Sequence, residues 1–219
     1  MKTFNGFITE AKKPKGAVFT FGRFNPPTTG HAKLVKQLQK VAKGFDVLLF
    51  TSHSNDRRKN PLTHKQKISY LRKFFGKIVV DSTVRTVFDV ANQLQQQKYT
   101  HVRMVVGSDR IREFETLLNK YNGVKARHGF YKFESIEVVS AGERDPDADD
   151  VSGMSASKLR TYAEQGDFDN FKVGVPSKNA SDIQRLYKDI RKGMGIMEST
   201  LPDYMNEDLI TEGVYDPGI

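Results

Sequence analysis

A strand, a tight turn and a helix follow one another directly near the start of the chain, and this stretch constrains the fold most. Apolar residues 17–21 predict a strand, and residues 32–38 have the apolar spacing of a helix. Backbone N–H groups at the N-terminus of a helix lack helical partners and carry partial positive charge, so they attract anions. The turn between the two elements therefore predicts a phosphate-binding site, and it reads Gly22-Arg23-Phe24-Asn25-Pro26-Pro27-Thr28-Thr29-Gly30-His31. The alternative is a proline-rich turn with a surface histidine.

The remaining sequence alternates between strand and helix patterns. Apolar runs predict strands over 16–21, 45–51, 77–80, 101–106 and 134–140. Helical spacing predicts helices over 30–43, 63–75, 84–97 and 110–119, one from Ser155 onward, and short ones over 168–173 and 178–192. Thr63 is the predicted N-cap of its helix. This alternation predicts an α/β fold, a Rossmann-like parallel sheet of about five strands with helices on both faces.

In such a sheet the ligand binds beyond the carboxyl ends of the strands. Three predicted strands end at Gly22, Ser52 and Gly107, beside the most polar motifs of the chain. We expect residues 16–192 to form one catalytic domain. Residues 1–15 are expected to be a flexible arm, and residues 193–219 an acidic tail.

Composition narrows the class of ligand. The 219-residue chain has a net charge of +9, but six acidic and no basic residues stand from Glu198 onward, so residues 1–197 carry +15. A basic body predicts an anionic partner, and a nucleotide is favoured over nucleic acid because no nucleic-acid-binding signature is present. The chain has no cysteine, no membrane-spanning run and no secretory leader, which predicts an intracellular protein in a reducing compartment.

The turn also resembles a known signature. The nucleotidyltransferase superfamily, which includes nicotinamide-mononucleotide, phosphopantetheine and cytidylyl transferases, shares the signature Gly-x-Phe-x-Pro-x-(His/Thr)-x-Gly-His. In this chain Thr28 stands at the His/Thr position, and Gly30 and His31 complete the motif.

A second stretch resembles the Ile-Ser-Ser-Thr-x-x-Arg pattern that opens a C-terminal helix in the same superfamily. It reads Met154-Ser155-Ala156-Ser157-Lys158-Leu159-Arg160. Met154 replaces the isoleucine and Ala156 replaces one hydroxyl residue. The alternative is a serine-capped helix with a surface arginine.

A third stretch, from Val106 to Phe114, resembles the Gly-Ala-Asp-x-Leu-x-x-Phe segment of nicotinamide-mononucleotide adenylyltransferases. The resemblance implies that Gly107 and Asp109 hold the ribose of ATP, since a carboxylate can accept from two vicinal hydroxyls. An ordinary helix N-cap at Ser108 or Asp109 is the alternative.

Together the resemblances imply that an acceptor phosphate attacks the α-phosphate of a nucleoside triphosphate and releases pyrophosphate. His31 and Thr28 would contact the α-phosphate. Arg160 would hold the β- and γ-phosphates together with Arg23, Ser155 and Ser157. The implied nucleotide-binding residues are Gly22, Arg23, Phe24, Gly30, Gly107, Asp109, Ser155 and Ser157. ATP or CTP would be the donor, with Mg²⁺ held mainly by the triphosphate and no protein metal site.

The acceptor is less constrained. The third motif implies nicotinamide mononucleotide, and the cations near the second strand that could contact its phosphate are Arg57, Lys59 and Lys65. A cytidylyl or adenylyl transferase for another small phosphate acceptor, and an inactive nucleotide-binding module with a structural or regulatory role, remain alternatives. The acidic loop 143–150 is expected to be a flexible loop beside the triphosphate, and His53, His64, His101 and His128 structural or surface residues. Self-association is left open.

Both ends of the chain carry a short repeated pattern. Ile-Thr-Glu stands at 8–10 and at 210–212, with the looser Ile-Met-Glu at 196–198. These resemble sites cut by prohead proteases of tailed bacteriophages, with chance as the alternative. The hypothesis is a phage-encoded protein, trimmed at its ends, that resides in the host cytoplasm or is packaged in the virion.

Overall fold

The computed structural model describes residues 14–142 and 154–196, and its centre is a parallel sheet of four strands. Strands β1 (Gly16–Gly22), β2 (Asp46–Thr51), β3 (His101–Val106) and β4 (Ser135–Ser140) lie in the order β2-β1-β3-β4. Val18 of β1 pairs with Val47 of β2 and Arg103 of β3, and Met104 pairs with Val138 of β4. The predicted α/β architecture with a parallel sheet is confirmed.

The strand predicted over residues 77–80 is wrong, so the described sheet has four strands rather than five. Gly76–Ile78 forms a 3₁₀ turn, η1, directly after helix α2 (His64–Phe75). Only the next two residues reach the sheet: Val79 bridges Leu49, and the Val80 N–H donates to the Leu49 carbonyl at 2.9 Å. The predicted strand has only four residues, and the 3₁₀ turn includes the first two of them. Too few residues remain to pair with β2 as a strand.

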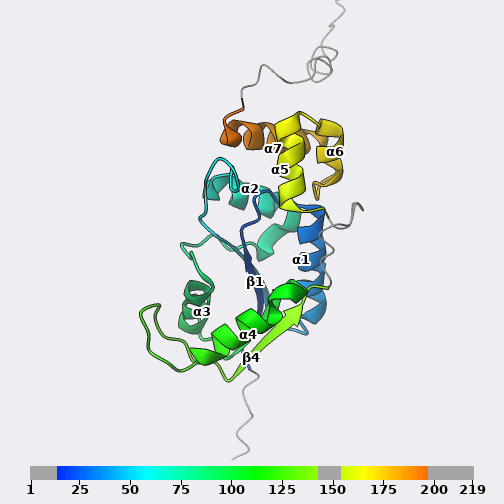
Figure 1. The fold of residues 1–219 in the computed structure, drawn as a ribbon. Helices are drawn as coiled ribbons and strands as arrows, with labels where there is room; N and C mark the ends of the chain where they lie inside the picture. Colours follow the sequence, from blue (N-terminus) through cyan, green and yellow to red (C-terminus); the bar gives the residue numbers. More distant parts are fainter. Residues whose placement is uncertain (1–13, 143–153, 197–219) are drawn as a thin grey trace, which may run out of the picture.

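Helices cover both faces of the sheet (Figure 1). Helix α1 (Thr29–Val41) lies on one face, where Leu38 packs with Val18. Helices α3 (Val87–Gln96) and α4 (Ile111–Lys120) lie on the other, where they pack against Phe19 and other inward residues of the strands. Because both faces are buried, the strands are nearly continuous apolar runs.

Threonine capping boxes set where three of the helices begin. In each, the threonine hydroxyl accepts from the N–H three residues on, and that residue's side chain accepts from the threonine N–H. The pairs are Thr28 with His31, Thr63 with Gln66, and Thr86 with Asp89. The predicted cap at Thr63 is confirmed, whereas the cap at Thr86 starts α3 three residues later than the predicted helix.

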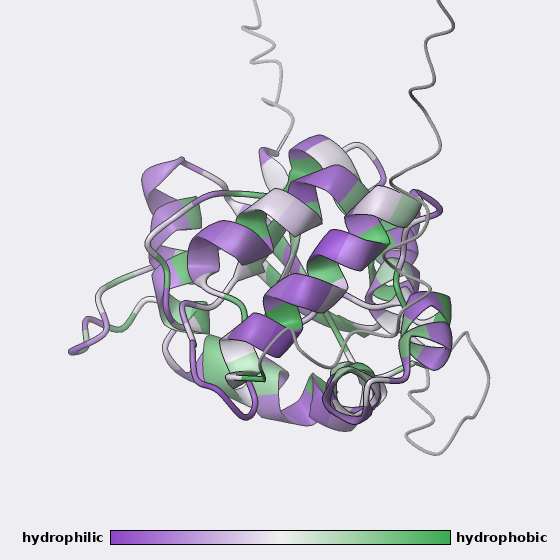
Figure 2. Ribbon diagram, turned by 90° about the horizontal axis from the view of Figure 1, so that it is seen from above, coloured by the Kyte–Doolittle hydropathy of each residue, from purple (hydrophilic) through white to green (hydrophobic). Residues whose placement is uncertain are grey.

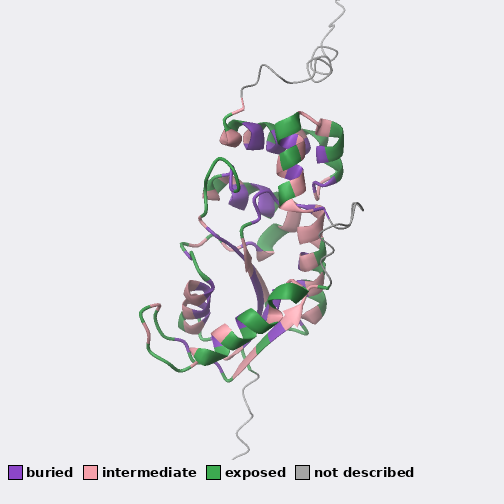
Figure 3. Ribbon diagram, viewed as in Figure 1, coloured by how far each residue is buried: buried purple, intermediate pink, exposed green. Residues whose placement is uncertain are grey.

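Three C-terminal helices gather at the end of the molecule to which the strands point (Figure 1). They are α5 (Ala156–Gln165), α6 (Phe168–Val173) and α7 (Ala180–Met194). Their apolar sides form a separate core with Leu62 and Tyr70, apart from the three clusters that include strand residues. Seen from above (Figure 2), hydrophilic and hydrophobic residues alternate along the helices, and Figure 3 marks exposed residues among buried ones on α5, α6 and α7.

Gly193 is the point at which α7 meets the loop before α2. A Cβ atom at this position would collide with the Pro61 carbonyl, whose carbon would lie 2.8 Å away. Helix propensity alone predicts that Gly193→Ala stabilises the protein by up to about 1 kcal/mol. The collision predicts the reverse, a loss of about 1–3 kcal/mol in the free energy of unfolding.

Urea unfolding of Gly193→Ala measures this change, and Lys188→Ala, an exposed site on the same helix, is the matched control. A Gly193→Ala protein as stable as the control would show that α7 can move away from Pro61 at no cost.

Several predictions fall on residues 1–13, 143–153 and 197–219, outside the described ranges. They concern most of the arm, the acidic loop, and the tail with most of its Ile-x-Glu patterns. The division into arm, domain and tail stays a prediction. Within the described ranges, no helix combines the length and apolar character needed to cross a membrane.

Candidate active site

The three motifs converge where the chain order reverses across the sheet. After β1 the chain crosses to β2 on one side, and it later returns to form β3 on the other side. The carboxyl ends of β1 and β3 therefore flank the switch point at which open α/β sheets bind their ligands. Gly22 ends β1, and Gly107 directly follows β3.

The turn after β1 is held in a strained shape by burial. Phe24 has a φ of 46°, in the left-handed region that side chains other than glycine rarely adopt. Its ring is 2% exposed and packs in the cluster of Leu71 and Val35, which holds the backbone in place. The same ring lies 4.7 Å from the imidazole of His31, centre to centre. Phe24 thus supports the histidine and is itself buried.

The capping box of α1 fixes the proton on His31. The Thr28 N–H donates to Nδ1 of His31 at 3.0 Å, and the Thr28 hydroxyl oxygen lies 3.0 Å from the same nitrogen. Because Nδ1 accepts, a neutral imidazole carries its proton on Nε2. Thr28 is buried, so it acts through His31 and the helix start. The N-terminus of α1 therefore offers an imidazole N–H donor.

The Ser155–Arg160 stretch lies directly against this turn. Arg160 donates from Nη1 to the Asn25 carbonyl at 2.8 Å and from Nη2 to the Ser157 hydroxyl at 3.0 Å. It is half-buried, and so is not a free surface arginine. A Cβ atom at Gly30 would lie 3.0 Å from the Met154 carbonyl oxygen, which leaves room there for glycine alone without adjustment. Ser155 does cap α5, accepting from the Lys158 N–H at 3.1 Å.

Positive charge from two arginines, Arg23 and Arg160, accumulates at this junction. Burial, and next to it the charge of Arg23, lower the pKa of Arg160, whereas Asp56 opposes them. Among the described residues, no carboxylate forms an ion pair with Arg23 or Arg160. Two neighbouring guanidinium groups are suited to phosphate oxygens.

At the end of β3 the structure excludes the capping alternative for the third motif. Residues Ser108–Arg110 form a 3₁₀ turn, η2, and neither it nor α4 has a side-chain cap. Asp109 is exposed and folds back over Gly107, where a Cβ atom would lie 2.6 Å from Oδ1. A side chain at Gly107 would displace the carboxylate, so glycine is required for this arrangement.

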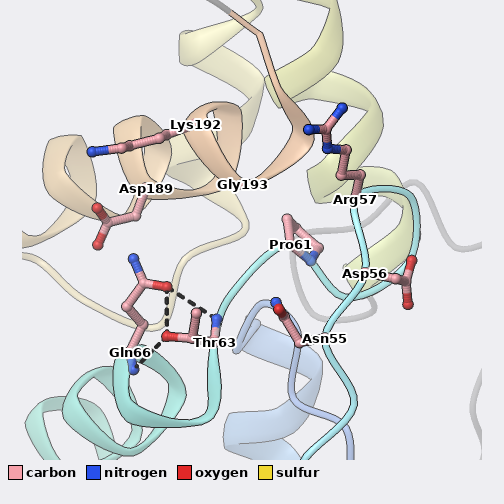
Figure 4. Close-up of a pocket in the computed structure, with 9 residues that line it drawn as sticks. All are labelled: Asn55, Asp56, Arg57, Pro61, Thr63, Gln66, Asp189, Lys192 and Gly193. Carbon is pink, nitrogen blue, oxygen red and sulfur yellow. Dashed lines mark hydrogen bonds between the residues drawn. The ribbon is translucent and has the colours of Figure 1, made fainter.

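The predicted acceptor cations are dispersed. Lys59 lies at the tip of a turn that Asp56 holds through the N–H groups of Arg58 and Lys59, and Lys65 lies on the exposed side of α2. Arg57 alone lines a pocket of about 360 Å³ between the loop after β2 and α7 (Figure 4). Its other lining residues are Asn55, Asp56, Pro61, Thr63, Gln66, Asp189, Lys192 and Gly193.

Two residues of this region were missed in the sequence. The buried Asn25 side chain accepts from the Leu62 N–H at 3.0 Å and donates to the Leu62 carbonyl at 2.9 Å, so it links the first turn to the next loop. Lys67 is fully buried and its Nζ donates to the Ser52 and Ser54 carbonyls. A signal for Lys67 was present, because it precedes Leu71 by four residues and so shares its inward face.

Two solved structures with the same fold differ in how much of their own length this chain matches. A putative nicotinate-nucleotide adenylyltransferase of Vibrio parahaemolyticus is 14% identical, with a TM-score of 0.50 over 78% of this chain and 98% of that one. TmcAL of Thermotoga maritima, bound with alpha-thio ATP, is 10% identical, with a TM-score of 0.51 over 82% of this chain. The chain matches 57% of the TmcAL length.

The nicotinic acid mononucleotide adenylyltransferase of Plasmodium falciparum, complexed with NaAD, is 15% identical, with a TM-score of 0.49 over 80% of this chain and 95% of that one. A comparison with curated proteins finds no match. The family model described as cytidylyltransferase-like matches residues 19–162, which include all three motifs. With the parallel sheet and the convergence of these motifs at its switch point, the match shows that the chain belongs to the cytidylyltransferase-like family of nucleotidyltransferases.

Proposed function

We propose that the protein transfers AMP from ATP to the phosphate of a pyridine mononucleotide and releases pyrophosphate. The observation that carries the proposal is the contact between Arg160 and the Asn25 carbonyl, which joins two motifs 135 residues apart. With Arg23 beside it, this contact makes one cationic site at the N-termini of α1 and α5. The third motif and the neighbour from Vibrio parahaemolyticus support nicotinamide or nicotinate mononucleotide as the acceptor.

In the proposed reaction an oxygen of the acceptor phosphate attacks the α-phosphorus of ATP. A new P–O bond forms, the bond from that phosphorus to the β-phosphate oxygen breaks, and pyrophosphate carries away the electron pair. Such a transfer depends on positioning and charge stabilisation rather than on a covalent intermediate with the protein. The Nε2–H of His31 donates to an α-phosphate oxygen as its charge grows. Arg23, Ser155, Ser157 and Arg160 hold the phosphates that leave.

Mg²⁺ would be held mainly by the triphosphate and water. In the described parts of the chain, no three His, Asp or Glu side chains gather in a way that could hold a metal ion. Bound to the triphosphate, the ion would neutralise charge on the leaving group.

Pyrophosphate release tests the proposal. The protein with Mg²⁺ is assayed with ATP or CTP against nicotinamide mononucleotide, nicotinate mononucleotide, phosphopantetheine and phosphocholine, and products are identified by mass. We expect release with ATP and a pyridine mononucleotide. Release only with CTP or with another acceptor would replace the proposed substrates, and no release with any pair would favour a nucleotide-binding module without catalysis.

A further inference from the structure

Lys67 is a lysine whose side chain is enclosed in the protein. It lies on α2 with an exposed fraction of 0%. Its Nζ donates to the Ser52 carbonyl and, at 3.4 Å, to the Ser54 carbonyl. Among the described residues no carboxylate forms an ion pair with it. The partners of this charge are therefore two carbonyls of one loop.

Packing alone does not explain a lysine at this position. Removal of an ammonium group from water is costly, and here burial lowers the pKa of Lys67 to about 8. A methionine has similar length and would fill the same space without that cost. The contribution that a methionine could not make is the pair of bonds to the Ser52 and Ser54 carbonyls.

The loop that Lys67 holds connects the first motif to the pocket. At its start, the Ser52 N–H donates to the Gly22 carbonyl at 2.9 Å, and the Thr51 hydroxyl donates to the Arg23 carbonyl at 3.2 Å. At its far end, Asn55, Asp56 and Arg57 line the pocket beside α7 (Figure 4). The Lys67 amine thus contacts the part of the loop that connects the first motif, where the triphosphate is proposed to bind, to the pocket, where the acceptor could bind.

We propose that Lys67 is a positioning residue for the acceptor nucleotide: by holding the Ser52 and Ser54 carbonyls it fixes the loop that carries Arg57 toward the acceptor phosphate. This inference rests on the proposed transfer reaction. It places acceptor binding on loop 52–57 and separates it from ATP binding at Arg23 and Arg160. The side chain is too buried to touch the substrate, so it acts through the loop.

Two histidines share this region. His53 stacks on His64 with ring centres 3.7 Å apart, and its Nε2–H donates to the Ser82 carbonyl at 2.9 Å. His64 lies 3.4 Å from Asp81, and burial, then the charge of His53, lower the pKa of His64. This shift moves the pKa of His64 away from that of Lys67.

The variant that tests the inference is Lys67→Met, with Lys77→Met, an exposed site just beyond α2, as the matched control. We expect the KM for the acceptor to rise at least tenfold in Lys67→Met and the KM for ATP to change less than threefold. Unchanged acceptor KM in a folded Lys67→Met protein, or an equal rise in both KM values, would overturn the inference.

The pH dependence separates positioning from a general structural role. Between about pH 8 and 10.5 the unfolded chain binds a proton at Lys67 that the folded protein has lost, so this group makes the folded state more stable as pH rises. A neutral amine holds the carbonyls less firmly, so kcat/KM for the acceptor should fall above pH 8 while stability does not. Lys67→Arg, which stays charged, should lack this fall. A wild-type profile that is flat up to pH 9.5 would contradict the inference.

A measurement that does not depend on catalysis distinguishes failure of the proposed transfer reaction from failure of the proposed role of Lys67. Failure of the wild type to release pyrophosphate with any pair would remove the proposed function. Amide hydrogen exchange of residues 52–57 then decides the role of Lys67 in holding the loop. Exchange should accelerate at least tenfold in Lys67→Met and not in Lys77→Met, and equal exchange in both would refute it.

Discussion

His31→Ala should lower kcat for pyrophosphate release by about 10²–10³-fold, because one donor aimed at developing charge contributes this much in comparable sites. Thr28 directs the imidazole by donating to Nδ1, which leaves the proton on Nε2. The KM for ATP should change far less, since in the proposed reaction the arginines and the α5 N-terminus hold the other phosphates. Steady-state kinetics with ATP and the acceptor measure both values. Lys33→Ala, exposed on the same helix, is the control.

The same substitution also removes the hydrogen bond that the His31 side chain accepts in the capping box, at a cost of about 0.5–1.5 kcal/mol in stability. His31→Gln separates the two effects, because Gln66 already completes a box of this kind with Thr63. Its melting temperature should return toward the wild-type value while kcat stays at least tenfold lower. Wild-type kcat in folded His31→Ala would remove the histidine from the proposed chemistry.

The strands were predictable because each lies between two layers. Ala17, Phe19 and Met104 face α3 and α4, whereas Val18 and Val105 face α1, so the alternation of a half-exposed strand is absent. The run at 77–80 has the same apolar character, yet Gly76 and the 3₁₀ turn leave it a single bridge. Composition cannot separate these cases, because the outcome depends on how far the preceding helix carries the chain.

Part of the candidate site could also be predicted from the sequence, and part could not. The resemblance brought Thr28, His31 and Arg160 into one prediction, and the structure places all three at one junction. It gave no information about the contacts of Asn25 and Lys67. Asn25 contacts the backbone of Leu62, and Lys67 contacts the carbonyls of Ser52 and Ser54, at separations of 13 to 37 residues in the sequence. Backbone acceptors have no residue identity, so such contacts leave no pattern in a single sequence. The helical spacing can separate the buried Lys67, on the inward face with Leu71, from the exposed Lys65, but it cannot reveal which carbonyls Lys67 contacts.

Arg160→Ala should raise the KM for ATP by about 10–100-fold, since a hydrogen bond to a charged group contributes about 1.5–3 kcal/mol. Arg160→Lys should recover only part of this loss. A lysine keeps the charge but lacks the planar fork that bonds Asn25 and Ser157 at once and still faces phosphate. Arg185→Ala, exposed on α7, is the control. Measured KM values for ATP and for the acceptor give the comparison.

The KM for the acceptor in Arg160→Ala shows whether Arg160 acts on ATP alone or on both substrates. If Arg160 holds only the leaving phosphates, its removal should leave acceptor binding within about threefold of wild type, and its effect should multiply with that of Lys67→Met, as expected for independent sites. If the acceptor KM rises as much as that for ATP, Arg160 serves both substrates through the Asn25 carbonyl and the Leu62 contact behind it. The assignment of Arg160 to the β- and γ-phosphates would then be wrong.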